Sequence, residues 1–127
     1  MLILVGIADE DTVEDIEWLV RKCAGLRIFD DAEGVMNLDI RQVGGEVLAV
    51  SQFTLMASTK KGNRPSYIRA AGEATALPLY RIFTERLAEL LGRPVATGVF
   101  GADMQVSLVN EGPCTIIIDT DEWKKKE

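Results

Sequence analysis

Two amphipathic segments, separated by short apolar runs, constrain the fold of this chain more than any other feature of its sequence. Asp11 or Thr12 can cap the first helix, which we expect to end at Gly25. Thr75 can cap the second helix, with Pro78 in its first turn. The apolar stripes at helical spacing are Val13, Ile16, Leu19, Val20 and Cys23 in the first segment and Ala76, Tyr80, Phe83, Leu87 and Leu90 or Leu91 in the second. Both stripes are expected to face a core.

The remaining apolar runs have the length of strands, and they give the order β-α-β-β-β-α-β-β-β. These runs are residues 2–7, 26–29, 35–38, 47–53, 95–100, 104–109 and 114–118. The order predicts an α/β fold, with one layered domain over residues 1–120, a mixed sheet and two main helices, followed by a charged tail at residues 121–127. Trp18 lies off the first helical stripe. It is either a partly exposed aromatic or part of a contact between subunits.

The composition indicates a single domain that folds without disulfides. A chain of 127 residues can bury a sufficient core. Its two cysteines, Cys23 and Cys114, lie in apolar surroundings and are predicted to be buried reduced thiols, which fits a reducing compartment. The apolar start runs directly into Asp9-Glu10-Asp11, and no apolar stretch approaches the length of a membrane span. We therefore expect a cytoplasmic protein that does not insert into membranes.

The absence of histidine excludes a Ser-His or Cys-His catalytic pair and any histidine-bearing metal site. We expect neither a metal nor a cofactor. The net charge of −6 argues against a broadly basic nucleic-acid surface, so an RNA partner would have to be held locally. The concentrated basic stretch inside the domain comprises Lys60, Lys61, Arg64 and Arg69. A further run, Lys124-Lys125-Lys126, lies in the terminal tail, which is predicted to be disordered.

The Gly112-Pro113 pair stands between two of the apolar runs. A pair of this kind is most often a plain turn between antiparallel strands. An X-Pro bond can also adopt the cis form at a cost of about 0.5–1 kcal/mol, and glycine lets another group approach the backbone closely. Two carbonyl oxygens that point the same way could then hold a small ammonium group and exclude a substituent on one side of its carbon. The pair is a candidate chirality filter made of backbone.

Four motifs occur in one order along the chain: Ser51-Gln52-Phe53-Thr54-Leu55, a basic Gly/Arg-Pro-Ser loop ending at Ser66, Gly101-Ala102-Asp103-Met104-Gln105-Val106-Ser107, and Asn110-x-Gly-Pro-x-Thr115. Together they resemble the D-aminoacyl-tRNA deacylase family, also called D-tyrosyl-tRNA(Tyr) deacylases, over residues 2–119. The resemblance implies a layered β/β/α domain. It also implies hydrolysis of the ester bond of D-aminoacyl-tRNA, and of glycyl-tRNA as an extension, to free amino acid and tRNA.

The resemblance places the reaction at the Ser51-Gln52-Phe53-Thr54 segment. Backbone amides near Phe53 and Thr54 are the candidates for contacting the oxyanion of the tetrahedral intermediate, while Ser51 and Gln52 would position the substrate. Thr54 could be a nucleophile, but a threonine hydroxyl without a base is a poor one at neutral pH. The terminal ribose hydroxyl of the substrate is the activator that the family implies. A purely structural Thr54 hydroxyl, bonded to backbone, is the alternative.

Further contacts are implied by the same resemblance. The resemblance places the terminal adenine of tRNA at three residues: Phe100, Gly101 and Met104. An aromatic face and a thioether suit the flat base, and core packing is the alternative role for these residues. The basic loop directly follows the proposed catalytic segment, so its cations would contact phosphate rather than only solvent: Lys60, Lys61 and Arg64. In the family, the Gly112-Pro113 pair of one subunit enters the site of the other, which implies a twofold homodimer.

The chain departs from the family pattern at its start, where members normally carry a strand hairpin of about two dozen residues before the stretch that matches Leu2. We expect an in-frame coding stretch for such a hairpin upstream of Met1. Two rival functions also fit parts of the pattern. One is a module that binds nucleic acid, either origin DNA or tRNA, without hydrolysis, and the other is a ligand-binding or synthetase-associated editing domain.

Overall fold

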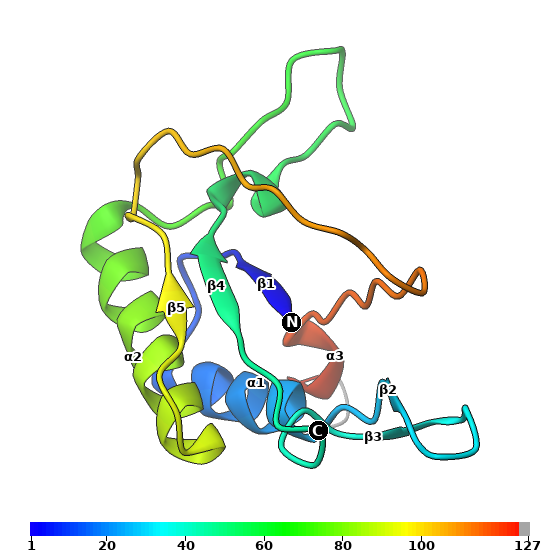
Figure 1. The fold of residues 1–127 in the computed structure, drawn as a ribbon. Helices are drawn as coiled ribbons and strands as arrows, with labels where there is room; N and C mark the ends of the chain where they lie inside the picture. The colour runs from blue at the N-terminus through cyan, green and yellow to red at the C-terminus, as the bar shows by residue number, and fades with distance from the viewer. Residues whose placement is uncertain (125–127) are drawn as a thin grey trace.

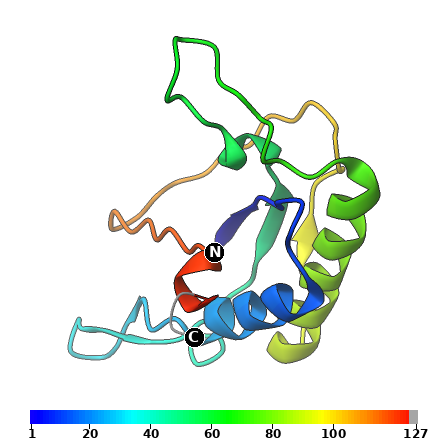
Figure 2. The same cartoon turned by 180° about the vertical axis from the view of Figure 1, so that it is seen from behind.

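A three-stranded parallel sheet in the order β1-β4-β5 lies at the centre of the computed structural model, which describes residues 1–124 (Figures 1 and 2). Its strands are β1 (Leu2–Val5), β4 (Leu48–Ser51) and β5 (Ala96–Thr97). A separate antiparallel hairpin pairs β2 (Phe29–Asp30) with β3 (Met36–Leu38). The fold is thus the expected α/β class with mixed pairing. The parallel pairs are joined through helices, as crossover connections require.

Helix α1 (Val13–Gly25) begins at a capping box. The Thr12 backbone N–H donates to Asp15 Oδ2 at 2.9 Å, and the Asp15 N–H donates back to Thr12 Oγ1 at 3.5 Å. Thr12 is therefore the N-cap, whereas the Asp11 carboxylate accepts the Ala8 N–H at 2.8 Å. Most of the predicted stripe is turned inward. Its exception is Val13, which is 44% exposed at the start of the helix.

Helix α2 (Glu73–Leu91) begins earlier than predicted. Gly72 is its N-cap, and the Gly72 carbonyl already accepts the N–H groups of Thr75 and Ala76 at 3.1 and 2.9 Å. The assignment of Thr75 as the cap is therefore wrong, and Pro78 lies in the second turn rather than the first. The predicted stripe is buried at Ala76, Tyr80, Phe83 and Leu87, with Leu79 added. The helix ends at Gly92, whose φ of +71° is left-handed.

The two helices pack against each other and against the sheet to form one core. Phe83 and Ile16 are each 1% exposed, and Ala49 of β4 is fully buried. The Tyr80 hydroxyl donates to the Ala49 carbonyl at 2.8 Å, which joins α2 to the sheet, and burial raises the pKa of Tyr80. No helix within residues 1–124 is long and apolar enough to cross a bilayer.

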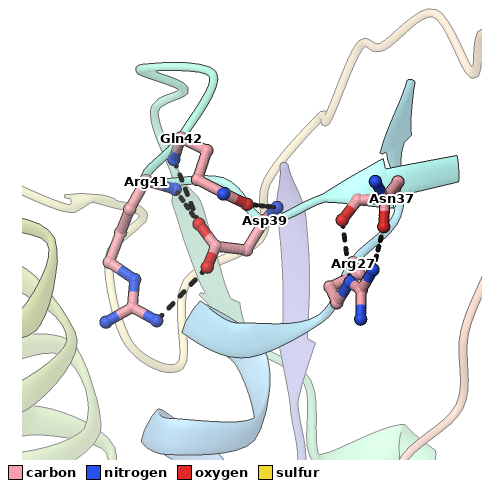
Figure 3. A network of polar contacts seen from close by, with 5 residues as sticks. All are labelled: Arg27, Asn37, Asp39, Arg41 and Gln42. Carbon is pink, nitrogen blue, oxygen red and sulfur yellow. Dashed lines mark hydrogen bonds and ion pairs between the residues drawn. The ribbon is translucent and has the colours of Figure 1, made fainter. Parts of the chain in front are cut away.

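A polar network holds the hairpin and the turn that leads into β4 (Figure 3). The Asp39 carboxylate accepts the backbone N–H groups of Arg41 and Gln42 at 2.9 and 3.0 Å, and the Gln42 side chain accepts the Asp39 N–H in return. The hydrogen bonds from the Gln42 backbone, with the nearby Arg41 guanidinium, lower the pKa of Asp39. Arg27 bonds the Asn37 backbone and side chain of β3. The turn is thus fixed by its own side chains.

Residues 98–120, called the distal segment below, leave the sheet after β5 and contain no strand. The predictions of strands over 104–109 and 114–118 are therefore wrong, and the predicted strand over 95–100 shortens to β5. Both sides of β4 are already paired, and no backbone hydrogen bond joins residues 103–117 to the rest of the described chain. An alternating apolar pattern does not form a strand unless a neighbouring strand supplies its backbone hydrogen bonds.

The chain also departs from prediction at two further points. The strand expected over 47–53 ends at Ser51, and a 3₁₀ helix, η1 (Phe53–Met56), takes its place. In the region expected to be a tail, α3 (Asp121–Lys124) forms after the distal segment. The rest of the predicted disordered tail, residues 125–127, lies outside the residues that the structure describes.

Candidate active site at the end of strand β4

The Ser51-Gln52-Phe53-Thr54 motif is placed where β4 ends beside β1. The Gln52 N–H donates to the Val5 carbonyl at 2.8 Å, which extends the pairing of the two strands by one bond. The chain then turns sharply into η1, which packs closely on the end of β1. A Cβ added to Gly6 would lie only 2.9 Å from Met56 Cε and 3.0 Å from Leu55 Cβ, so a larger residue here would have to displace η1 side chains. The motif is therefore held at the carboxyl end of the central strand, against the end of β1.

The side chains of Gln52 and Thr54 form a pair. Gln52 Nε2 donates to Thr54 Oγ1 at 2.6 Å, and both side chains are half-buried. A hydroxyl that accepts such a bond loses electron density from its oxygen, and no base contacts it within the described residues. The geometry therefore weakens Thr54 as a nucleophile. It also differs from the alternative role expected for Thr54, because the partner is a side chain rather than backbone.

Two adjacent backbone donors lie at the same place. The N–H groups of Phe53 and Thr54 open η1, and neither donates to another group within residues 1–124. The Phe53 ring is 56% exposed and meets the edge of Tyr67 with ring centroids 5.1 Å apart. Tyr67 follows the basic loop and was missed by sequence reasoning. An aromatic residue directly after the Pro65-Ser66 pair was the available signal.

The residues predicted to hold adenine lie at the start of the distal segment. Phe100 packs on the core, with its ring centroid 6.0 Å from that of Tyr80. Met104 folds back over Gly98. A Cβ added to Gly98 would collide with the Met104 sulfur and would lie 4.0 Å from Val50 Cγ2. Met104 is thus brought beside β4, just before Ser51. Gly101, with φ of +77°, makes the turn between these two side chains.

The Gly112-Pro113 peptide bond is cis, which is the form that the candidate chirality filter requires. Asn110 braces the turn from within: its Oδ1 accepts the Cys114 N–H, and its Nδ2 donates to Thr115 Oγ1, both at 3.3 Å. The turn is exposed, and in both overall views the distal segment carries it away from η1 before returning to α3 (Figures 1 and 2). No hydrogen bond within residues 1–124 joins it to the Ser51-Thr54 motif. One chain does not bring these two elements together.

The predicted phosphate-binding loop projects from the body beyond η1 (Figure 1). An antiparallel bridge closes its base, with N–H···O bonds of 2.8 and 2.9 Å between Ser58 and Ser66. Its cations are exposed, and in the described part of the chain none of them forms an ion pair: Lys60, Lys61 and Arg64. Within residues 1–124, no three His, Cys, Asp or Glu side chains gather as metal ligands do.

Comparison with known proteins agrees with this arrangement of motifs. Residues 1–119 match the D-Tyr-tRNA(Tyr) deacylase family. The chain belongs to this family. A D-aminoacyl-tRNA deacylase of Parabacteroides distasonis is 59% identical over 120 residues, covering 94% of this chain and 80% of the relative, and one of Porphyromonas gingivalis is 62% identical with the same coverage. A solved structure named c-Myc DNA Unwinding Element Binding Protein is 40% identical with a TM-score of 0.84, covering 91% of this chain and 78% of that one.

Proposed function

We propose that this protein hydrolyses the ester bond of D-aminoacyl-tRNA, releasing free amino acid and tRNA, as a proofreading step in translation. Close relatives carry the name of this activity. The observation that carries the proposal is the pair of unengaged N–H groups at Phe53 and Thr54, fixed at the end of β4. Two such donors can stabilise a tetrahedral oxyanion, each at about 3–4 kcal/mol in a water-poor site. Glycyl-tRNA is a second substrate under this proposal, since glycine has no side chain to be excluded.

The chemistry assigns a role to each group. Water attacks the ester carbonyl, the carbonyl oxygen becomes an oxyanion held by the Phe53 and Thr54 amides, and the ester C–O bond then breaks. The ribose oxygen leaves with a proton as a hydroxyl. The neighbouring ribose hydroxyl of the substrate assists the attack, because Thr54 Oγ1 is already engaged by Gln52 and has no base. Ser51 and Gln52 position the substrate.

The enzyme is proposed to act as a homodimer in which the Gly112-Pro113 turn of each subunit completes the partner's site and excludes the L-isomer. Two features support this assignment. The turn is exposed and remote from η1 within its own chain. The distal segment around it also presents large apolar side chains to solvent, with Val109 92% and Ile117 89% exposed. Such a surface is typical of an interaction site.

The remaining contacts follow the substrate outward from the reacting ester. Met104 and Phe100 would hold the terminal adenine beside β4, while the loop around Lys60 and Lys61 would meet phosphates of the acceptor stem. Replacing the loop cations with alanine should weaken tRNA binding and reduce the salt dependence of that binding. An unchanged salt dependence would show that the loop contacts only solvent. The variants are Lys60→Ala, Lys61→Ala and Arg64→Ala combined.

Proline at position 53 gives a direct test of the oxyanion assignment. Phe53→Pro removes one backbone N–H at the first residue of η1, where proline is tolerated, and Phe53→Ala is its matched control because it removes only the ring. We expect kcat for D-aminoacyl-tRNA to fall about 100-fold to 1000-fold in the proline variant relative to the alanine variant. Equal rates in the two variants would refute the role of this amide.

Substrate lacking the terminal 2′-hydroxyl separates the two activators. Cleavage should be much slower on this substrate, whereas Thr54→Val on normal substrate should retain most turnover. The reverse pattern would make Thr54 the reactive group. Parallel assays with D-, L- and glycyl-tRNA then define the substrate class.

Complementation between subunits tests the shared site. A subunit with Gly112→Ala has an altered turn, and one with Phe53→Pro has an altered pocket. Each is expected to be poorly active alone, yet in a mixed dimer one of the two sites receives both intact elements. When equal amounts of the two variants pair at random, about half of the dimers are mixed and each has one intact site. Mixing should therefore restore about a quarter of wild-type activity. If native mass spectrometry shows mixed dimers but activity does not recover, the turn acts in the site of its own chain.

The alternative of a nucleic-acid-binding module without hydrolysis is not favoured, because the curated relatives named above are deacylases. A DNA-binding name belongs to one solved relative, and this chain's net charge of −6 gives no broad basic surface to match it. We retain the cytoplasm as the proposed location, since both cysteines are free and this fits a reducing compartment.

A further inference from the structure

The distal segment is attached to the body only near its two ends. At its start, Phe100 packs on the core and Met104 packs over Gly98. At its end, Ile118 packs on the core and α3 follows. Between these points, no backbone hydrogen bond ties residues 105–117 to the rest of the described chain. The position of the Gly112-Pro113 turn therefore depends on how firmly the two ends are held.

A tryptophan clasp holds the second end. Trp123 of α3 stacks on Trp18 of α1, with ring centroids 6.1 Å apart and planes inclined by 24°. Lys22, one helical turn after Trp18, places its Nζ 5.4 Å from the Trp18 ring centroid. The Trp123 Nε1 atom is buried and has no hydrogen-bond partner within residues 1–124. The clasp thus joins the last helix to α1, which is itself anchored in the core by Ile16 and its neighbours.

The tryptophan pair and the end of the distal segment lie around one hollow. Both tryptophans, together with Lys22, Glu122 and the last two isoleucines of the segment, line one hollow of about 230 Å³. Ile118 is the residue by which the segment rejoins the core, and Ile117 beside it is 89% exposed. The end of the segment therefore lies beside the place where α3 meets α1.

We propose that Trp123, acting with Trp18, is a positioning residue for the Gly112-Pro113 turn. The stack fixes the end of the distal segment on the rigid α1 helix, which restricts the positions that the turn can reach. Neither tryptophan touches the reacting groups. Its effect on D-aminoacyl-tRNA hydrolysis rests on the proposed function above, whereas its effect on the order of the turn does not.

Hydrogen exchange and circular dichroism test the clasp without any substrate. The chain contains only two tryptophans, so an exciton signal from stacked indoles belongs to this pair. Trp123→Ala should abolish this signal and raise exchange about threefold to tenfold at the hydrogen-bonded amides of the turn and of α3, those of Cys114 and Glu122, which corresponds to the usual strength of an aromatic pair. Asp121→Asn, on the same turn of α3 but outside the lining of this hollow, is the matched control and should change neither. Unchanged exchange in Trp123→Ala would overturn the proposal.

Activity assays add a second test, because a residue that only stabilises the fold would not change the D-over-L ratio. Trp123→Ala should lower kcat and the D-over-L ratio by about threefold to tenfold with little change in KM, and Trp123→Phe should recover most of the loss because it can still stack. Trp18→Ala should match Trp123→Ala, and the double variant should be no worse than either. Additive losses, or no rescue by phenylalanine, would refute a shared stack.

The two proposals fail in different ways. A wild-type protein that cleaves no D-aminoacyl-tRNA would refute the proposed function, and the exchange comparison would still decide the clasp. An active wild type with identical exchange in Trp123→Ala would refute the clasp and leave the deacylase assignment standing.

Discussion

The body of the molecule, formed by β1, β4, β5, α1 and α2, differs sharply from the distal segment in how its apolar residues are used. In the body they are buried: Phe83 and Leu87 are each 1% exposed. In the distal segment, equally apolar residues face solvent, as Val109 does at 92% exposure. The body is stabilised by its own packing, whereas the distal segment carries residues whose proposed partners are a tRNA and a second subunit. The comparison separates residues that make the fold from exposed residues that we propose make contacts outside it.

Large-to-small substitutions should show this difference most strongly. Phe83→Ala is expected to reduce the free energy of unfolding by about 3–5 kcal/mol, because it empties a fully packed site. Val109→Ala should change it by less than about 0.5 kcal/mol, since the side chain has little to lose. Urea unfolding at low protein concentration measures both. A similar loss for Val109→Ala would show that the distal segment is packed in solution.

The two cysteines provide a chemical version of the comparison. Burial raises the pKa of Cys23 on α1 to about 11 from an ordinary value of 9.0. Its thiolate at about pH 8 is then about 100-fold scarcer than in the unfolded chain, so native Cys23 should react with a disulfide reagent at least about 100-fold more slowly than after unfolding. Cys114, half-buried in the distal segment, should react in the native protein. Mass spectrometry of the labelled peptides distinguishes the two, and rapid native labelling of Cys23 would contradict the packing of the body.

Glycine-to-alanine substitutions compare the turn with a neutral site. Gly112 has a φ of +142°, and an added Cβ would lie 3.0 Å from the Cys114 nitrogen, so Gly112→Ala should displace the turn. Strain of about 1–3 kcal/mol is expected there, with kcat/KM for D-aminoacyl-tRNA reduced about tenfold. Gly34→Ala, in the β2-β3 hairpin, is the control: its φ is +75° and nothing lies within 4 Å of an added Cβ. It should cost stability without changing the D-over-L ratio, and equal kinetic losses would argue against a special role for Gly112.

Acid should loosen the β2-β3 hairpin, which is the smallest of these effects. The backbone N–H groups of Val35 and Glu33 bond the Asp31 carboxylate and hold its pKa below the ordinary value of 3.8. The ionised form is therefore favoured in the folded state, and its contribution is complete above pH 3.8 and lost as the pH falls through the lower folded value. Exchange of the Val35 amide should rise over this window relative to Asp31→Asn, which has no such titration. An identical pH dependence in both proteins would show that the Asp31 carboxylate does not stabilise the hairpin.

Local signals in the sequence were sufficient for much of the body. The choice of Asp11 or Thr12 as the first cap, the end of α1 at Gly25 and the buried stripe through Phe83 all depend on residues close to one another in the chain. The distal segment could not be predicted in this way. Its alternating apolar residues are typical of strands, but a strand also requires a partner edge, and this chain places none beside it.

The candidate site shows the same division. The motif through Thr54 and the Gly112-Pro113 pair were identified from the sequence, and the cis bond was confirmed. The sequence did not predict that Phe53 and Thr54 open a 3₁₀ turn with two unengaged amides, or that Gln52 occupies the Thr54 hydroxyl. It also did not predict the stack of Trp18 on Trp123, because the spacing of two residues so far apart in the chain carries no signal of contact.

By itself, the sequence determined the family, the α/β class, the helical stripes and the absence of any histidine chemistry, because motifs, periodicity and composition are written in residue order. The tertiary structure decided which apolar runs became strands, where the unengaged amides lie and what holds the distal segment to α1. These depend on contacts between residues far apart in the chain. Whether such a contact forms is set by the partners that each group finds in space, so no local pattern encodes it.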